Sequence, residues 1–563
     1  MRKLLSVLLM LCLLGSLLVP FAVAEGEEPI TLTVFRGDPG DQPYEDNKIY
    51  KKIADEFGVT FEFEFLAGDL DEKLGLMTQD LDDLPDLFDG GNSAEKLIDS
   101  GALINLLDYV NPEDTPNLWA HIEPQKNRII TKDEDTGEDV MYIIPNYGLG
   151  EGEQIALSVG GPAFFIQKQV LAWGGYPQIH TLDEYFDLIE RFLEANPTNA
   201  DGTEYIGFDI LCEDWRRFCL INPVQHLMGR PNDGEVLIDV TKDDYPTETF
   251  INRAYAKPYY KKLNEEFQKG IIKPDTFVMS YDQYIAQLSS GIVLGMFDQA
   301  WDFGNATNAL LTDGKFENTY VALGLIYDEN EVKDVLPEGW KIEEHYLNGS
   351  LPNLDRGFGI SVSCKCPERI VKMWERMMDY DWQLLFNWGV EGEDYSIENG
   401  RLTMTAEQYA NTQDVEWQRH NKALAFFQSS PKRQGWIMEG DLAGNCWEPA
   451  NQPEIVFGQM NQYDKDFLAA YGYQKFADFV NPPIELAPYG EAWQIDYSPV
   501  DVEHQDFLDI QDKMLPEVIM CDPAEFDAKW DAFVEAITPS ATAFGEFMQE
   551  QVVAEAQKVL GNE

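Results

Sequence analysis

The chain has 563 residues, which is too long for one ordinary hydrophobic core, so two or more lobes are expected. A hydrophobic content of 44% and an aromatic content of 12% exclude a largely disordered chain. The formal net charge of -59 repels polyanions at long range, which disfavours nucleic acid and anionic lipid as partners.

The first 24 residues have the pattern of a secretory signal peptide. Two basic residues lie near the start, an apolar run covers residues 4–19, and the small residues 22–24 form a cleavage site. A membrane anchor is disfavoured because the apolar run is short and acidic residues follow it. Bulky residues precede Cys12, so no lipobox is present there. We therefore expect an exported protein of the periplasm, the cell envelope or the extracellular medium.

Strands and helices alternate in the first part of the mature chain. Alternating apolar residues predict the strands, and apolar residues at helical spacing predict the helices. The expected order is strand 30–35, helix 47–57, strand 60–65, helix 71–81, strand 84–88 and helix 93–100. This order predicts an α/β lobe with a largely parallel sheet.

Polar residues follow two of these strands. Arg36 and Asp38 come after the first strand, and Asp89 and Asn92 come after the third. Ligands of such sheets bind at the carboxyl ends of strands, so these four side chains are candidates for one half of a ligand cleft. The alternative for residues 89–92 is a turn with a helix cap, because Asn and Gly serve both purposes.

A second α/β stretch begins near residue 163. Its expected elements are strand 163–166, helix 182–195, strand 205–211, helix 253–269, strand 292–296, strand 357–362 and helix 367–380. Thr181 and Glu184 have the spacing of a capping box at the start of the first helix. From about residue 382 the chain is rich in aromatic residues and is expected to be mainly helical.

The strand at 292–296 is followed by Asp298, Gln299, Trp301 and Asp302. Two interpretations compete: an ordinary surface loop, or a ligand platform at the carboxyl end of a strand. Trp301 can also pack between helices, which is the commonest environment of tryptophan.

Six cysteines remain after the signal peptide. Cys364 and Cys366 have neither a second cysteine pair nor a histidine nearby, which argues against a metal site. Export permits disulfides, and Cys212 and Cys219 are close enough in sequence to form one.

Four stretches, in this order, resemble extracellular solute-binding proteins of carbohydrate ABC importers. Residues 76–88 contain the family's DLPD segment, and residues 260–275 resemble its helix that closes in KGLID. Residues 387–400 are similar to its GxEGxxYxxxxG signature, and residues 507–536 resemble its terminal helices. The large branch of oligosaccharide-binding and alginate-binding receptors is the most similar.

The resemblance implies a two-lobed α/β fold of the periplasmic-binding-protein type II class, with a hinge, a ligand cleft and a helical C-terminal part. Lobe 1 is expected to contain residues 25–155 and 315–385, and lobe 2 residues 156–314 and 386–563. The implied function is an extracytoplasmic receptor, not an enzyme, that is monomeric and delivers an oligosaccharide to an ABC transporter permease. The acidic surface favours a neutral sugar.

A sugar receptor needs flat aromatic rings for the sugar faces and polar groups for the hydroxyl rim. Trp301 lies where the family places a sugar-stacking aromatic residue, with Asp298 and Gln299 as rim partners. Trp215, Trp388 and Trp493 are further candidates, although Gly389 and Gly392 also fit a tight structural turn around Trp388.

Several relatives carry a calcium loop where this chain has residues 196–204. Calcium takes six to eight oxygen ligands, usually with several carboxylates among them. The loop offers Asn196, Asn199, Asp201 and Glu204. Only two of these are acidic, so we favour a solvated loop without metal and expect no cofactor.

Two other functional classes remain as alternatives. A secreted carbohydrate-active hydrolase also uses aromatic rings and carboxyls, but 100 acidic residues make any single pair uninformative. A peptide-binding receptor of similar build is the second alternative.

Overall fold

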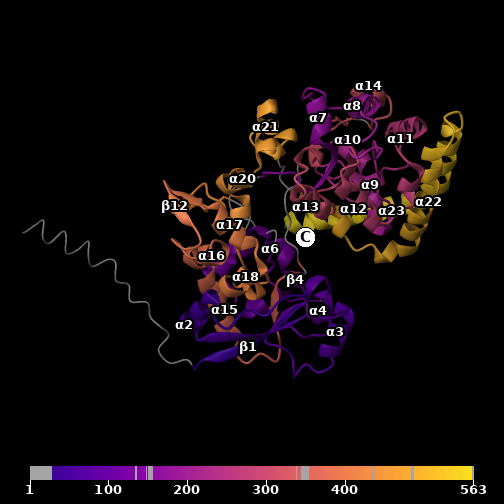
Figure 1. Cartoon of the computed structure of the whole chain (residues 1–563). Coiled ribbons are helices and arrows are strands. Elements are labelled where there is room, and N and C mark those ends of the chain that lie inside the picture. Colours follow the sequence, from indigo (N-terminus) through magenta and orange to yellow (C-terminus); the bar gives the residue numbers. More distant parts are fainter. Residues whose placement is uncertain are drawn as a thin grey trace, which may run out of the picture.

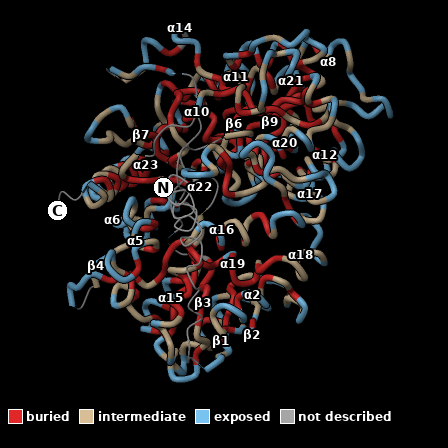
Figure 2. Tube along the Cα trace, turned by 90° about the vertical axis from the view of Figure 1, so that its left-hand side faces the viewer, coloured by how far each residue is buried: buried red, intermediate tan, exposed pale blue. Residues whose placement is uncertain are grey.

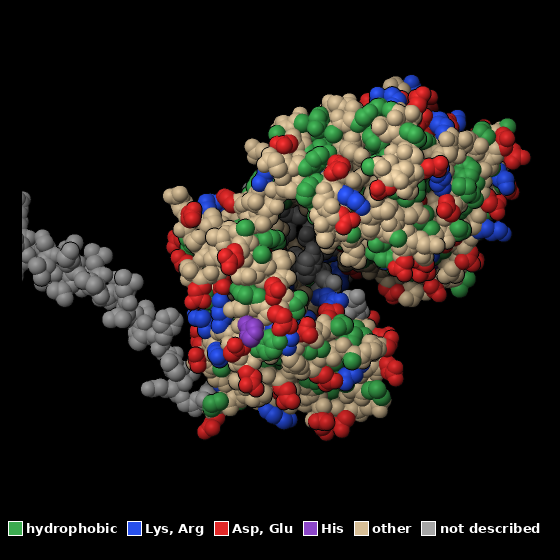
Figure 3. Space-filling model, viewed as in Figure 1, with side chains coloured by type: hydrophobic (Ala, Val, Ile, Leu, Met, Phe, Trp, Pro, Cys, Tyr) green, Lys and Arg blue, Asp and Glu red, His purple; other side chains and the backbone are tan. Residues whose placement is uncertain are grey.

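The computed structural model describes residues 28–133, 136–146, 149, 156–337, 339–343, 354, 356–433, 437–482 and 487–560. The predicted signal peptide lies outside these residues. The described chain forms two lobes (Figure 1). The space-filling view shows a deep hollow between them (Figure 3). Buried residues gather in two separate bodies, one in each lobe (Figure 2). Among the described residues, no helix combines the length and the apolar character that crossing a bilayer requires.

The first lobe is built on a four-stranded sheet in the order β11-β3-β1-β2. Its strands are β1 (Ile30–Arg36), β2 (Val59–Phe65), β3 (Leu87–Asp89) and β11 (Phe358–Ile360). β1 pairs in parallel with β2 and β3, whereas β11 is antiparallel to β3. The helices of this lobe are α2 (Lys48–Phe57), α3 (Leu70–Met77), α4 (Glu95–Asp99), α5 (Pro116–Ile122), α6 (Lys126–Ile129), α15 (Pro367–Met377) and α16 (Tyr380–Asn387). The predicted parallel α/β lobe is confirmed.

The second lobe contains a three-stranded sheet in the order β10-β6-β9. Its strands are β6 (Pro162–Gln167), β9 (Gly295–Gln299) and β10 (Tyr320–Leu323), and both pairings are antiparallel. Its helices are α7 (Lys168–Trp173), α8 (Leu182–Ala195), α9 (Phe218–Ile221), α10 (Pro223–Leu227), α11 (Lys257–Lys269), α12 (Tyr281–Ser290), α13 (Gly304–Thr312), α14 (Glu329–Val332), α22 (Asp501–Met520) and α23 (Phe526–Leu560). The predicted helix 182–195 and its capping box are confirmed in α8.

Two strand predictions in this lobe need correction. Residues 205–211 form no regular strand; they make only isolated parallel bridges, Ile206 to Val293 and Asp209 to Met296. The strand predicted at 292–296 is β9, which begins and ends three residues later. Asp298 therefore belongs to the strand and not to the loop after it.

The final third contains short helices and two hairpin strands. They are β12 (Ser396–Glu398), β13 (Arg401–Thr403), α17 (Ala406–Gln413), α18 (Val415–Asn421), α19 (Leu424–Phe427), α20 (Pro453–Gln459) and α21 (Gln462–Tyr471). Residues 423–427 pack in the core of the first lobe, whereas residues 460–480 and 507–541 pack with the second lobe. Four more short strands lie outside the main sheets: β4 (Thr131–Lys132) and β5 (Asp139–Val140) pair with each other, and β7 (Val236–Ile238) pairs with β8 (Thr247–Thr249).

The lobe boundaries differ from those expected from the sequence. β10 is an edge strand of the second sheet, so residues 320–323 belong to the second lobe and not to the first. Phe386 and residues 423–427 reach the first lobe's core instead of the second. The two lobes also touch where Asn127 Nδ2 of α6 donates to the Val559 carbonyl of α23, at 2.6 Å.

Candidate functional site

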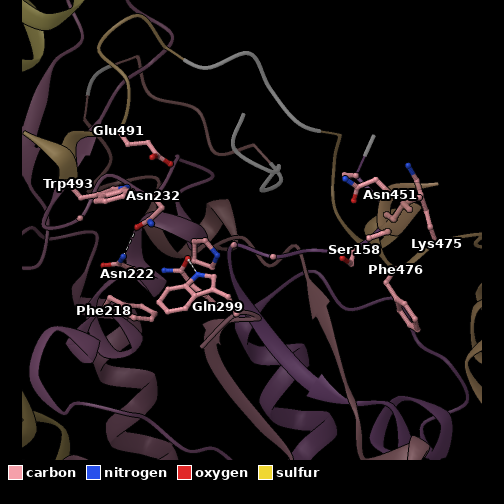
Figure 4. Close-up of a pocket in the computed structure, with 18 of the residues that line it drawn as sticks. Ser158, Phe218, Asn222, Asn232, Gln299, Asn451, Lys475, Phe476, Glu491 and Trp493 are labelled. Carbon is pink, nitrogen blue, oxygen red and sulfur yellow. Dashed lines mark hydrogen bonds between the residues drawn. The ribbon is translucent and has the colours of Figure 1, made fainter. Parts of the chain in front are cut away.

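A cavity of about 940 Å³ opens on the side of the second lobe that carries the end of β9. Its wall combines indole rings with amide and charged side chains. Its lining includes Trp215, Arg217, Phe218, Asn222, Asn232, Glu235, Gln299, Trp301, Asn451, Lys475, Phe476, Glu491, Trp493 and Tyr497. Figure 4 labels ten of the lining side chains, from Glu491 and Trp493 on one side to Lys475 and Phe476 on the other.

Two tryptophans form a stacked pair on this wall. The rings of Trp215 and Trp301 lie nearly parallel, with centroids 5.8 Å apart and planes inclined by 15°. Trp301 is 57% exposed and Trp215 is 52% exposed. The Phe218 ring lies against both indoles, with its centroid 5.9 Å from that of Trp215 and 6.5 Å from that of Trp301. Large apolar rings that are half exposed and stacked at a cavity provide a flat surface on which a ligand can lie.

A tight turn after β9 directs Trp301 outward. The Asp302 backbone N–H donates to the Gln299 carbonyl at 2.9 Å, and the Ala300 N–H donates to the Gly160 carbonyl at 3.0 Å. The Trp301 indole Nε1–H donates to Gln299 Oε1 at 2.9 Å. The local hydrogen bonds therefore fix both the direction of the ring and the position of the neighbouring amide.

An ion pair connects the two loops that carry these rings. Arg216 Nε donates to Asp302 Oδ1 at 3.1 Å, and the Asp302 side chain is 2% exposed. The guanidinium lies between two rings, 4.4 Å from the centroid of Trp215 and 3.9 Å from that of Tyr281. Burial raises the pKa of Asp302, and the Arg216 charge opposes that rise. Because Arg216 follows Trp215 and Asp302 follows Trp301, the pair holds the two indoles side by side. We call Trp215 and Trp301 the indole platform.

Some residues predicted as ligand contacts lie at the cavity and others do not. Trp301, Gln299, Trp215 and Trp493 all line it. Asp298 does not. It is fully buried in β9, where Oδ2 accepts from the Tyr284 hydroxyl and Oδ1 from the Gln299 N–H, both at 2.7 Å. Burial, together with the charge of Asp302, raises the pKa of Asp298 to about 7.

Trp388 also lies away from the cavity. Its ring has 0% exposure and packs with Tyr395 and Trp447 in a hydrophobic cluster. Its indole N–H donates to the Cys446 carbonyl at 3.2 Å. Gly389 has φ +94°, a backbone conformation that glycine tolerates, so the turn interpretation of this stretch holds.

The residues predicted on the first lobe form a structural cluster. Arg36 and Asp89 are 4% and 1% exposed, and Arg36 Nε donates to Asp89 Oδ2 at 3.1 Å. Arg36 Nη1 also donates to the Ala425 carbonyl at 2.8 Å. Asp38 pairs with Arg356. Asn92 belongs to a 3-10 turn, Gly91–Ser93, and its side chain lies outside the described atoms. Arg36 lines a separate cavity of about 250 Å³ in the first lobe and not the large one.

In the loop 196–204, which was considered as a calcium site, side chains form hydrogen bonds with the backbone. Asn199 Oδ1 accepts the backbone N–H groups of Asp201 and Thr203 at 3.0 and 2.9 Å. Asn196 Nδ2 donates to the Phe192 carbonyl, and Glu204 makes an isolated bridge with Thr198. Within the described ranges, no group of three or more His, Cys, Asp or Glu side chains has an arrangement suited to a metal ion. Cys212 and Cys219 are free thiols and not the disulfide that their spacing suggests.

Sequence reasoning missed most of the polar lining. Asn222, Asn232, Glu235, Lys475 and Glu491 reach the cavity from loops and short helices without a recognisable motif. A signal was present near Glu491, since it lies two residues before the predicted Trp493.

Comparison with solved structures identifies the fold, although neither a protein-family model nor a curated protein matches the chain. An extracellular solute-binding protein from Bifidobacterium longum subsp. infantis matches with a TM-score of 0.62 at 14% identity, covering 95% of this chain and 99% of that chain. An HMO-binding, ABC-transporter-associated solute-binding protein from Bifidobacterium longum infantis matches with a TM-score of 0.59 at 15% identity, covering 94% and 99%. The Streptococcus pneumoniae ABC-transporter substrate-binding protein FusA, in complex with kestose, matches with a TM-score of 0.54 at 16% identity, covering 95% and 100%. Over nearly its whole length, the chain has the two-lobed α/β fold of these solute-binding proteins.

Proposed function

We propose that the protein is an extracytoplasmic receptor that captures an oligosaccharide between its lobes and delivers it to the permease of an ABC transporter. The observation that carries this proposal is the indole platform at the wall of the 940 Å³ cavity, faced by amide side chains. The neighbours in fold include a protein that binds HMO and one solved with kestose.

The size and chemistry of the cavity suit a sugar of several residues. A volume of 940 Å³ lies at the upper end of the range of small-molecule pockets. Stacked rings each contribute on the order of 1 kcal/mol beyond area burial, and a micromolar ligand needs roughly 8 kcal/mol in total. Three half-exposed tryptophans with Asn222, Asn232 and Gln299 therefore supply contacts of the right kind.

Closure of the hollow between the lobes would complete the site. The cavity lining comes from the second lobe and from residues 450–476. In our proposal the sugar first stacks on the indole platform, and the first lobe then closes over it. Only a ligand that binds the closed form more tightly than the open form shifts that equilibrium. The permease would recognise the closed form, and the protein would act outside the cytoplasm as a monomer.

The test is calorimetric titration of the mature protein with a panel of oligosaccharides, in the wild type and in Trp301→Ala. We expect 1:1 binding to at least one sugar, weakened about 10- to 100-fold by the substitution, which corresponds to roughly 1.4–2.8 kcal/mol. Trp173→Ala, an exposed tryptophan outside the cavity, is the matched control and should leave the affinity unchanged. An unchanged affinity in Trp301→Ala would show that the indole platform does not contact the ligand.

Product analysis separates a receptor from a hydrolase. Incubation of the bound oligosaccharide with the protein should leave the number of reducing ends constant. Accumulation of new reducing ends would favour the hydrolase alternative, and titration with peptides instead of sugars tests the peptide receptor.

A further inference from the structure

One wall of the cavity consists of two loops that pack directly on each other. Asp233 accepts the Ala492 backbone N–H at 3.0 Å and the Tyr489 hydroxyl at 2.9 Å. A Cβ atom added at Gly234 would lie 3.1 Å from the Cβ of Trp493. Residues 232–235 and 491–497 therefore form one continuous surface, which we call the acidic wall.

Two carboxyl groups of the acidic wall, those of Glu235 and Glu491, line the cavity. Within the described part of the chain, neither Glu235 nor Glu491 forms an ion pair with a lysine or arginine. Glu491 Oε2 accepts an amide N–H from Gln494 at 3.0 Å, and the Trp493 side chain also donates to this carboxyl. Burial raises the pKa of Glu235, and burial together with Asp233 raises the pKa of Glu491 to about 7. A carboxylate in such a position is stabilised by any cation that reaches it.

The side-chain oxygen of a buried amide beside the same wall receives no hydrogen bond from the described residues. Asn222 is 3% exposed and lines the cavity, and its Nδ2 donates to Asn232 Oδ1 at 2.7 Å (Figure 4). Its Oδ1 accepts no hydrogen bond from any described residue. A buried acceptor without a donor costs free energy, so this oxygen favours a ligand that brings an N–H or O–H group.

Aromatic rings flank the carboxyl groups. Trp493 is 50% exposed and Tyr497 is 36% exposed, and both line the cavity. His504 connects Tyr497 with Glu235. Its ring centroid is 4.3 Å from that of Tyr497, and its Nε2 is 4.0 Å from the Glu235 carboxyl. Aromatic faces next to carboxylates are a favourable environment for an ammonium group.

The cationic side chains of the cavity do not neutralise this wall. Lys475 lies on the opposite side, beside Asn451 and Phe476 (Figure 4). Arg217 is close enough to lower the pKa of Glu235, but its own ion pair is with Asp512, at 3.3 Å. The acidic wall therefore keeps an excess of negative charge.

We infer that the ligand of this cavity carries a protonated amine, as an amino sugar does, and that the amine lies between Glu235 and Glu491 against Trp493. This inference rests on the proposed function and names the substrate class of the same site. It replaces the wholly neutral sugar expected from net charge, because a net charge of -59 disfavours anions but does not disfavour cations.

The test compares two probes that differ only at nitrogen: the fully deacetylated and the fully acetylated β-1,4-linked tetramers of glucosamine. Each is titrated calorimetrically into the mature protein at low and high salt. High salt is essential because the acidic surface attracts any polycation, and salt screens exposed charges more than buried ones. We expect the amine form to bind 1:1 and at least tenfold more tightly, with the preference retained at high salt.

Substitutions of single glutamates test which carboxyl groups cause the preference for the amine form. Glu491→Gln and Glu235→Gln should each reduce the ratio of the two affinities at least fivefold. Glu503→Gln removes the same charge from an exposed position at the start of α22 and should leave the ratio unchanged. If Glu503→Gln and Glu491→Gln have equal effects, the preference comes from the general negative charge of the protein surface, and the inference is overturned.

The two proposals fail in different ways. If the acetylated tetramer, or any neutral oligosaccharide, binds as tightly as or more tightly than the amine form, the amine inference is overturned and the sugar receptor stands. That outcome includes a neutral sugar receiving hydrogen bonds from protonated carboxyls. If neither probe nor any other oligosaccharide binds, both proposals are overturned.

Discussion

The ends of β9 and β1 carry similar residue types but have opposite environments. After β9, Gln299 and Trp301 lie open at a large cavity. At the ends of β1 and β3, Arg36 and Asp89 are buried and bound to each other. The difference lies in what covers the strand ends. Residues 424–429 lie over the first lobe's strands, where the Ala425 carbonyl and the Ser429 hydroxyl bind the pair. The position of a residue at a strand end therefore does not by itself make a ligand site.

The largest expected effect is a loss of stability at the covered ends of β1 and β3. Asp89→Ala leaves the buried Arg36 guanidinium with no carboxylate nearer than that of Asp38, at 3.8 Å, and breaking a buried ion pair in this way costs about 3–5 kcal/mol of unfolding free energy. Chemical denaturation, followed by a probe in the first lobe, measures the loss. Sugar binding, measured below the unfolding transition, should persist because neither residue lines the large cavity.

Asp187→Ala serves as the control for that experiment, since its ion pair with Arg191 is exposed on α8. Exposed pairs contribute at most about 1 kcal/mol. A loss in Asp89→Ala no greater than in the control would show that the Arg36 cluster is not a structural element, and the contrast between the two strand ends would disappear.

A smaller effect, on ligand affinity, is expected at the end of β9, which opens on the large cavity. Arg216→Ala removes the connection between the loops of the indole platform, so we expect oligosaccharide affinity to fall about tenfold, or roughly 1.4 kcal/mol. Circular dichroism gives a second measurement, because two stacked indoles produce a coupled band in the ultraviolet. The band should weaken in Arg216→Ala and disappear in Trp215→Phe.

Arg191→Ala removes the same charge from an exposed position on α8 and is the matched control. Asp302→Asn, which preserves the shape of the partner, should weaken the coupled band in the same direction as Arg216→Ala. A band that survives both Arg216→Ala and Asp302→Asn would mean that the indoles hold each other without the ion pair.

The two strand ends also show what the sequence can and cannot predict. Local patterns predicted β1 and α8 and made the tryptophan after β9 a candidate, because periodicity, caps and a tryptophan after a buried strand are visible within a few residues. They could not predict that residues from position 424 onward cover Arg36, nor that Trp388 meets Trp447 in a core. Both depend on segments distant in sequence. A shift of three residues at β9 was enough to move Asp298 from the predicted rim to the interior.

The last prediction concerns Asp298, which that shift places in the interior. The pKa of Asp298 is raised to about 7 in the folded protein, chiefly by burial, above its ordinary value of 3.8. The folded state therefore binds more protons than the unfolded state between these values, so the contribution of Asp298 to stability decreases as the pH rises. Between pH 6 and pH 8 the decrease is about 1.4 kcal/mol, the equivalent of one pKa unit. Asp298→Asn cannot lose a proton, so its stability should fall less than that of the wild type over this interval. Parallel denaturation curves of the two proteins at both pH values measure the difference, which cancels the contribution of the other acids. Identical pH dependence would mean that Asp298 titrates normally, as expected only for a carboxyl at the solvent-exposed rim of the cavity and not for one inside β9.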